Sequence, residues 1–288
     1  MLKFLTKAII FLGVVVGAIT FVYLYDLYQE IKDDIDSVVN YNPKQSTQFF
    51  DKNGKLLANT FKDENREYVN YDDIPARVIE GLVAIEDTQF FEHFGVNPDA
   101  ISRAVIKNIQ SGGYSEGAST LTQQLIKVLL LSREKKIIRK VKEALLAIRL
   151  ETVLTKEEIL ERYLNHVYFG HGYYGVKTAA KGYFKKNLYE LTLKEIAILV
   201  GLPRAPSFYD PTKNLQVSLA RANQVITRMH TLGWINNEQF EESINETPTI
   251  YNQTLTQNIA PYAIDYAVSE LVNDIPDILY GGYKVYLT

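Results

Sequence analysis

The stretch Glu86-Asp87-Thr88-Gln89-Phe90-Phe91-Glu92-His93-Phe94-Gly95 follows an apolar helical run at 78–85, so two adjacent acids stand at a helix end beside aromatic residues. Acids are seldom fully buried without a partner. Among aromatic rings the charged form of a carboxylate is disfavoured, which is one way a protein makes a usable general base. The same residues also fit a solvated helix C-terminus, so this stretch alone leaves both interpretations open.

Four further segments follow in order along the chain. They are Gly117-Ala118-Ser119-Thr120-Leu121-Thr122-Gln123-Gln124, Arg139-Lys140-Val141-Lys142-Glu143, the run 156–165 ending in Tyr163-Leu164-Asn165, and the proline-rich segment 203–211. Together the five segments resemble the peptidoglycan glycosyltransferase domain of class A penicillin-binding proteins and of monofunctional murein polymerases, over about residues 65–240. The chain departs from the family pattern at Ala118 and Val128, and neither change removes a charge.

The resemblance implies a mainly α fold, a lysozyme-like multi-helix glycosyltransferase domain with a small β element, preceded by one transmembrane helix. We expect a cytoplasmic tip and membrane anchor at 1–30, a linker with a β-hairpin at 31–70, the glycosyltransferase domain at 71–250, and at 251–288 the start of a linker to a transpeptidase-like C-terminal domain.

The N-terminal segment indicates a membrane anchor. Residues 8–25 form an uncharged apolar run that is long enough to cross a bilayer. Lys3 and Lys7 precede this run and acids follow it, so the positive-inside rule places the N-terminus in the cytoplasm. A cleaved signal peptide is the alternative, but no small-residue cleavage site follows the run. We expect a single-pass protein of the bacterial inner membrane, with its catalytic domain periplasmic or extracellular.

Composition narrows the function further. The chain of 288 residues has no cysteine, which excludes disulfides and thiolate chemistry, and its net charge of -3 gives no indication of nucleic-acid binding. Local signals predict a hairpin around Lys52-Asn53-Gly54, a third short strand at 66–70, a mobile glycine-rich loop at 111–117, and a final strand at 283–287 with nothing local to pair with. They also predict helices at 98–110, 119–131, 135–153, 175–184, 214–232, 237–245 and 261–273, and capping boxes at Thr155/Glu158 and Thr192/Glu195.

Glu86 is the candidate general base, because Ile85, Phe90, Phe91 and Phe94 can raise its pKa. The resemblance gives the first-motif glutamate this role. Asp87 can hold Glu86 or a neighbouring main-chain amide. A histidine between aromatic residues is more often structural than catalytic, so we expect His93, like Asn165, to support the site from behind.

Arg139, Lys140 and Glu143 share one face of the predicted helix 135–153. A solvated, salt-bridged face is the ordinary explanation. However, Arg139 precedes Glu143, the less favourable order for helix stability, and one acid among several bases suits a phosphate site. The resemblance places Lys127, Lys135 and Lys140 at the donor's diphosphate and makes Glu143 the second essential acid.

Hydroxyl and amide side chains open the helix predicted at 119–131. They can cap this helix, or an anion can bind its free N–H groups. Amides also suit sugar hydroxyl and acetamido groups. The resemblance implies that the sugar-binding cleft is lined by Ser119, Thr120, Gln123, Gln124 and Tyr168.

The predicted function is polymerisation of lipid II into β-1,4 glycan strands with inversion and release of undecaprenyl diphosphate. A lysozyme-like hydrolase or lytic enzyme is the alternative, but a hydrolase needs an acid for its poor leaving group, whereas a basic cluster suits diphosphate. A catalytically dead glycan-binding scaffold would lack the two glutamates. Ser132-Arg133-Glu134-Lys135 matches a transpeptidase motif, but no K-[ST]-G accompanies it.

The partners expected are lipid II, the lipid-linked glycan chain, the lipid bilayer and other cell-wall synthesis proteins, but no nucleic acid. No cofactor is required, and Mg²⁺ or Mn²⁺ can assist at the diphosphate, although no ligand cluster demands a metal. Four consecutive apolar residues, 128–131, lie between Lys127 and the basic run 133–136, which predicts a second membrane contact there.

Overall fold

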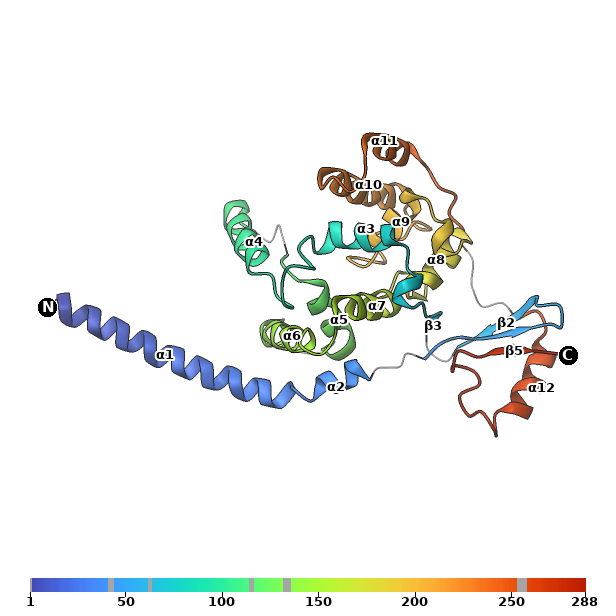
Figure 1. Cartoon of the computed structure of the whole chain (residues 1–288), viewed down its shortest axis with the longest axis horizontal. Helices are drawn as coiled ribbons and strands as arrows, with labels where there is room; N and C mark the ends of the chain where they lie inside the picture. Colours follow the sequence, from blue (N-terminus) through green and yellow to red (C-terminus); the bar gives the residue numbers. More distant parts are fainter. Residues whose placement is uncertain (1, 41–43, 62–63, 114–116, 132–135, 253–257) are drawn as a thin grey trace. The chain divides into compact units, whose positions relative to one another are not determined.

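The computed structural model describes residues 2–40, 44–61, 64–113, 117–131, 136–252 and 258–288 and is mainly helical (Figure 1), which confirms the predicted fold class. The chain divides into two compact units. Unit 1 contains Met1–Tyr41 and Glu92–Thr155, and unit 2 contains Asn42–Phe91 and Lys156–Thr288. The domain boundaries expected after residues 30, 70 and 250 stay predictions.

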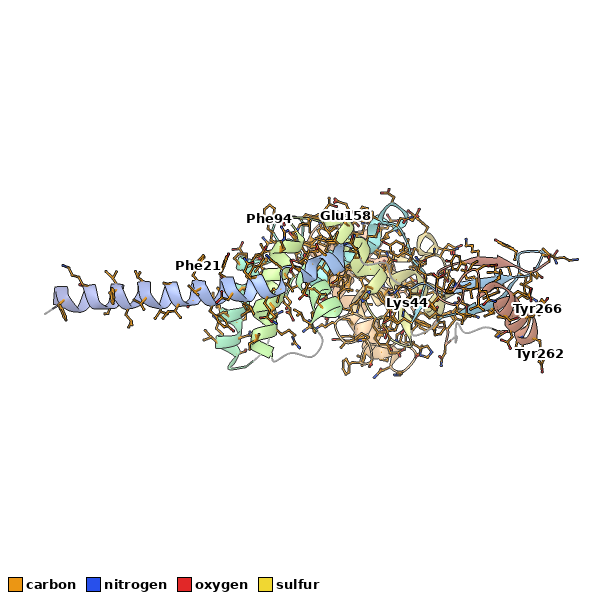
Figure 2. All side chains as sticks on the ribbon, turned by 90° about the horizontal axis from the view of Figure 1, so that it is seen from below. Phe21, Lys44, Phe94, Glu158, Tyr262 and Tyr266 are labelled. Carbon is orange, nitrogen blue, oxygen red and sulfur yellow. The ribbon has the colours of Figure 1, made fainter. Side chains whose placement is uncertain are left out.

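Unit 1 begins with the long helix α1, Leu2–Ile31. Its segment Ile9–Ile31 is long and apolar enough to cross a membrane, with a mean hydropathy of 2.1. Most side chains between Ile9 and Asp26 are exposed, as Phe21 illustrates in Figure 2. Helix α1 therefore continues beyond the uncharged run that ends at Tyr25.

The end of α1 packs against the body of unit 1. Leu27 and Ile31 are buried, and Glu30 forms an ion pair with Lys142 at 3.4 Å. A second short helix, α2 (Asp34–Val39), follows and packs against α5 and α6. The segment after the predicted anchor is therefore helical and packed within unit 1.

Helices α4, α5 and α6 complete unit 1 and cover Pro98–Ser111, Leu121–Leu130 and Lys136–Leu150. Helix α4 begins at residue 98, as predicted. The side chain of Asn97 accepts a hydrogen bond from Ala100 N at 2.9 Å and caps the helix, and Pro98 occupies its first turn. Gly95 has a φ of 79°, and a Cβ there would lie 2.5 Å from the main chain of Ala147. Only glycine allows this approach.

Unit 2 contains a three-stranded sheet with the strand order β2-β1-β5. Strands β1 (Thr47–Phe50) and β2 (Leu56–Thr60) form the predicted antiparallel hairpin. The final strand, β5 (Lys284–Tyr286), pairs with β1 in parallel, so its partner lies near the opposite end of the sequence. Helix α12 (Pro261–Leu271) packs on this sheet through Ile264 and Ala267. Tyr262 and Tyr266 project from its other face (Figure 2).

The prediction that a third short strand joins the hairpin is wrong. Strand β3 (Asn65–Arg66) pairs with β4 (Tyr173–Tyr174) in a separate two-stranded sheet. Its two side chains are buried, and the partner strand lies more than a hundred residues away in sequence. A local pattern cannot reveal such a pairing.

The helical part of unit 2 packs α3 (Ala76–Glu86) against α9 (Leu193–Gly201) and α10 (Leu215–Thr231). The Thr192/Glu195 capping box that opens α9 is present as predicted. The remaining elements are η1 (Tyr71–Asp73), α7 (Lys156–His166), α8 (Val176–Phe184), η2 (Leu188–Glu190) and α11 (Asn237–Asn245).

Candidate active site

One buried acid organises the basic face of α6 in unit 1. The side chain of Glu143 is 1% exposed. Its carboxylate lies 2.5 Å from Lys140 Nζ and 3.2 Å from Arg139 Nε. A carboxylate removed from water needs such partners, because an unpaired buried charge is strongly destabilising. Glu143 therefore forms ion pairs with both cations.

Lys140 also connects α6 to the segment before α5. Its ammonium group donates a hydrogen bond to Ser119 Oγ at 2.6 Å, while about half of its side chain stays exposed. Residues of two separate sequence motifs thus meet in unit 1. An exposed ammonium group fixed by two oxygens suits the binding of an anion from solvent.

Thr120 and Gln123 have a different part. Thr120 Oγ1 accepts a hydrogen bond from Gln123 N, and Gln123 Oε1 accepts one from Thr120 N, so the pair forms the capping box of α5. Thr120 also donates to the carbonyl of Gly95 at 2.6 Å. Both residues are buried and hold the helix start in place, whereas Gln124 is only half-buried.

The other predicted cations are less closely gathered. Lys127 is exposed in the last turn of α5. Lys135 lies outside the described residues, as do residues 114–116 of the predicted mobile loop. Within the described part of unit 1, Arg139 and Lys140 are therefore the cations that converge on a predicted site residue.

Glu86 ends α3 in unit 2 and faces an arginine. Its side chain is 10% exposed, and Oε1 lies 3.2 Å from a terminal nitrogen of Arg221, whose side chain is 4% exposed. Burial lowers the pKa of Arg221, and the charge of Glu86 opposes this effect. Burial, together with the negative charge of Glu86, raises the pKa of Tyr163 well above its usual value.

The aromatic residues next to Glu86 in sequence differ in exposure. Phe90 is fully buried, and Lys156 Nζ lies 4.4 Å from its ring centroid. Phe91 is mostly exposed and packs edge-on against Phe90. The carboxylate of Glu86 thus has a buried arginine as a direct partner, in addition to any apolar surroundings.

The sequence analysis did not single out Arg221, although a signal was present. The buried face of α10 includes Ser218, Ala222, Val225 and Met229 at helical spacing, and Arg221 lies on the same face. An arginine on the apolar face of a helix is rarely buried without a partner. Such a position predicts an acid on a neighbouring helix.

The remaining predicted residues lie around these clusters. Asp87 is buried and caps the C-terminal end of α3, and His93 is buried in unit 1. In unit 2, Asn165 is buried and binds the N–H and C=O of Val69 at 2.8 Å and 2.7 Å. Tyr168 packs against Tyr174, with ring centroids 4.9 Å apart.

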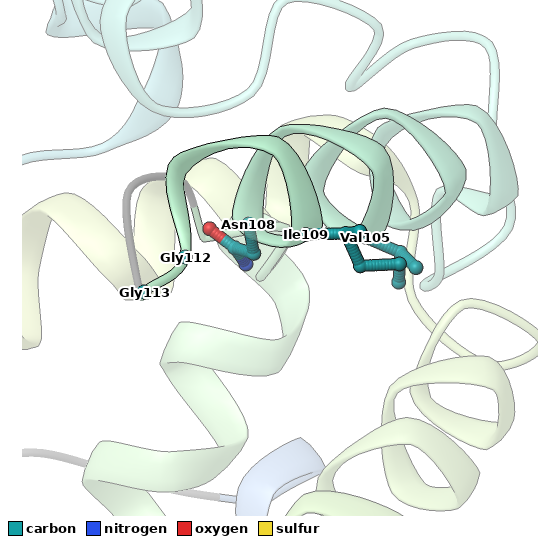
Figure 3. Close-up of a pocket in the computed structure, with 5 residues that line it drawn as sticks. All are labelled: Val105, Asn108, Ile109, Gly112 and Gly113. Carbon is teal, nitrogen blue, oxygen red and sulfur yellow. The ribbon is translucent and has the colours of Figure 1, made fainter.

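A shallow depression of about 450 Å³ lies beside α4 (Figure 3). It is lined by Val105, Asn108, Ile109, Gly112 and Gly113. Its apolar side chains belong to an exposed apolar face of α4 that the sequence analysis did not identify as a surface.

The predicted second membrane contact at 128–131 is only partly exposed. Val128 is exposed, Leu129 and Leu130 are half-buried, and Leu131 is buried. In the described part of unit 1, the apolar face of α4 therefore exposes more of its apolar side chains than this segment does.

The five motifs predict a sugar-transferring enzyme, and the structure holds two of their acids, Glu86 and Glu143, against basic partners. A model of the transglycosylase family matches residues 53–230, so the chain belongs to that family. This match confirms the peptidoglycan glycosyltransferase class and favours it over a lysozyme-like hydrolase.

Two curated relatives are similar over nearly the whole chain. Penicillin-binding protein 1A of Aquifex aeolicus is 40% identical over 280 residues, which cover 96% of this chain and 38% of the relative. Penicillin-binding protein 1A of Escherichia coli is 38% identical over 270 residues, covering 92% and 32%. The chain thus spans less than two-fifths of the length of these relatives.

The crystal structure of penicillin-binding protein 1A from Haemophilus influenzae matches 85% of this chain and 27% of its own, with 26% identity and a TM-score of 0.47.

Proposed function

We propose that this chain polymerises lipid II into glycan strands. Glu86 takes the proton from the 4-hydroxyl of the acceptor's N-acetylglucosamine. The resulting oxygen attacks C1 of the lipid-linked chain from the face opposite the leaving group. A β-1,4 bond forms, the bond from C1 to the diphosphate oxygen breaks, and undecaprenyl diphosphate leaves with the electron pair.

The contact between Lys140, Ser119 and Glu143 carries this proposal. An inverting transfer from a diphosphate donor needs cations for the leaving group and no acid to protonate it. Lys140 and Arg139 are held by one buried acid, and Lys140 stays half-exposed. In this proposal Arg139, Lys140, Lys127 and Lys135 bind the diphosphate, and Glu143 keeps the first two aligned.

The acceptor side of the reaction uses unit 2. A general base must be ionised before it can take a proton, and an adjacent cation favours the ionised form. Arg221 supplies that cation at 3.2 Å from Glu86. Asp87 supports the position of Glu86 at the end of α3. In this proposal Tyr168 contacts the sugars in unit 2, and Ser119 and Gln124 contact them in unit 1.

The location follows from α1 and from the substrate. In this proposal helix α1 anchors the chain in the bacterial inner membrane, with the N-terminus in the cytoplasm and the residues that follow α1 outside. Its partners there are lipid II, the growing lipid-linked chain and the bilayer, together with other cell-wall synthesis proteins. Mg²⁺ or Mn²⁺ assists at the diphosphate without being required, so EDTA should lower the rate without abolishing it.

Incubation with lipid II and gel separation of the glycan products tests the proposal. Glu86→Gln should slow polymerisation by at least about 100-fold, a typical general-base contribution, with an unchanged thermal unfolding midpoint. Glu80→Gln is the matched control, because Glu80 is a half-exposed acid on the same helix that pairs with Arg77. Near wild-type polymerisation by Glu86→Gln would remove Glu86 as the base.

A further inference from the structure

The environment of Arg221 is unusual for a structural arginine. One terminal nitrogen binds Glu86 Oε1 at 3.2 Å, and the other binds Gln224 Oε1 at 3.1 Å. Its Nε is buried and has no hydrogen-bond partner among the described residues. A buried donor left without a partner is costly, and such exceptions call for an explanation.

The surroundings of Arg221 direct its guanidinium group toward Glu86. The Tyr209 ring centroid lies 5.6 Å from the guanidinium carbon. Gly201, the last residue of α9, leaves room for the side chain, because a Cβ there would lie 2.9 Å from Arg221 Cγ. Two elements outside α10 thus restrict where this arginine can point.

We propose that Arg221 is a positioning residue for the proton transfer at Glu86, holding Oε1 so that Oε2 faces the acceptor hydroxyl. This inference rests on the proposed role of Glu86 as general base. When Oε2 takes the proton, Glu86 becomes neutral and Arg221 remains buried without its counter-charge. That state is unfavourable, so the pair drives release of the proton to solvent and returns Glu86 to its ionised form before the next sugar is added.

The other charged and titratable groups near the pair act on it differently. Tyr163 of α7 is coupled to Glu86, but burial keeps its hydroxyl neutral throughout the accessible pH range. Arg204 and Tyr209, from the segment between α9 and α10, act on Arg221 with opposite signs. Arg221 directly contacts Glu86, so its removal should change the pH dependence of the reaction.

The test measures kcat/KM for lipid II polymerisation between pH 5 and pH 9 with the full chain. In Arg221→Gln the acid limb of the pH–rate profile should move to higher pH by about one unit or more, since a neighbouring opposite charge lowers the pKa of a carboxyl group by that amount. The rate should therefore recover in part at high pH. Arg221→Lys, which keeps the charge and loses the planar geometry, should show a smaller shift and a lower kcat.

Gly201→Ala is the second variant, because it displaces Arg221 without removing it and should shift the acid limb in the same direction. Arg77→Gln is the matched control: it breaks an arginine–glutamate pair with Glu80 on the same α3 helix and should leave the profile unchanged. An unshifted acid limb in every folded variant at positions 221 and 201, whatever the rate, would reduce Arg221 to a structural role. Failure of the underlying function is visible separately, because the wild-type chain would then make no glycan.

Discussion

Lys140 donates a hydrogen bond to Ser119 Oγ at 2.6 Å, which joins α6 to the residue directly before the N-cap of α5. The contact fixes an ammonium group on the side where the α5 helix begins. Helix N-termini favour anions through their free N–H groups, so the ammonium group and the helix start reinforce each other as a site for negative charge.

Lys140→Ala should weaken the binding of phosphoglycolipid inhibitors of the moenomycin type, which resemble the donor in this family. Loss of one charge-assisted contact costs about 1.5–3 kcal/mol, or roughly 10- to 150-fold in affinity. Displacement of a fluorescent inhibitor measures the change. Lys186→Ala, which removes another lysine paired with a buried glutamate at 2.8 Å, is the control. Unchanged affinity in Lys140→Ala would place the phosphate site elsewhere.

His166 should make the folded chain less stable in mild acid. Burial, helped by Arg66, lowers its pKa to about 4. The folded pKa lies below that of the unfolded chain, so between these values the unfolded state binds more protons and stability falls as pH falls. From pH 7 to pH 5 the free energy of unfolding should drop by about 2 kcal/mol. Denaturant unfolding in detergent measures this loss.

In His166→Gln most of that dependence on pH should disappear. His230→Gln, at a half-exposed position that contacts Asn237, should keep the wild-type dependence. The same slope in His166→Gln and in the wild-type chain would show that other groups cause the acid sensitivity.

Local sequence signals predicted several helices, because residues at their starts supply capping chemistry. The Asn97 cap and the Thr192 capping box are examples. Pairings between distant segments could not be predicted in this way. The parallel pairing of β5 with β1, and of β3 with β4, depends on how the chain returns on itself.

In the candidate site, too, contacts within one helix could be predicted from the sequence and contacts between distant segments could not. Arg139, Lys140 and Glu143 lie three and four residues apart on one helix, so their mutual contact follows from helix geometry. The link from Lys140 to Ser119 joins α6 to the segment before α5, and that from Glu86 to Arg221 joins α3 to α10. Only the packing of those helices reveals them.

The apolar face of α4 should enter the bilayer. Ile109 is 76% exposed, and Ile101, Val105 and Ile106 are exposed on the same helix. Ile35 and Val38 of α2 are buried, so removing α1 and α2 would uncover the side chains of α5 and α6 that α2 covers; the full chain is therefore the suitable form for a test.

In a chain with Trp234 replaced by Phe, the tryptophan introduced by Ile109→Trp should lose fluorescence when the vesicles contain brominated lipids, because these lipids quench tryptophan inside the bilayer. Lys107→Trp, two positions away on α4 and so on a different face, is the control. Equal quenching at both positions would mean that α4 does not enter the bilayer.

Because α1 packs on α6, the distance along α1 from the end of its uncharged run to α6 is fixed. Glu30, which pairs with Lys142, lies five residues beyond Tyr25, about 7–8 Å along a continuous helix. We therefore expect the cations of α6 to lie at a set height above the hydrocarbon, at the level of the diphosphate of a membrane-bound substrate. Four alanines inserted after Tyr25 would raise α6 by about 6 Å with a rotation of only about 40°.

That insertion should slow polymerisation of lipid II in vesicles and spare polymerisation in detergent, where the substrate has no fixed height. The same four residues placed before Lys3 should change neither rate. Equal rates in vesicles for both insertions would mean that height is not set by α1. If the rates differ, α1 sets the distance of the catalytic residues from the membrane as well as holding the chain there. The thickness of the surrounding membrane would then affect the rate of glycan synthesis.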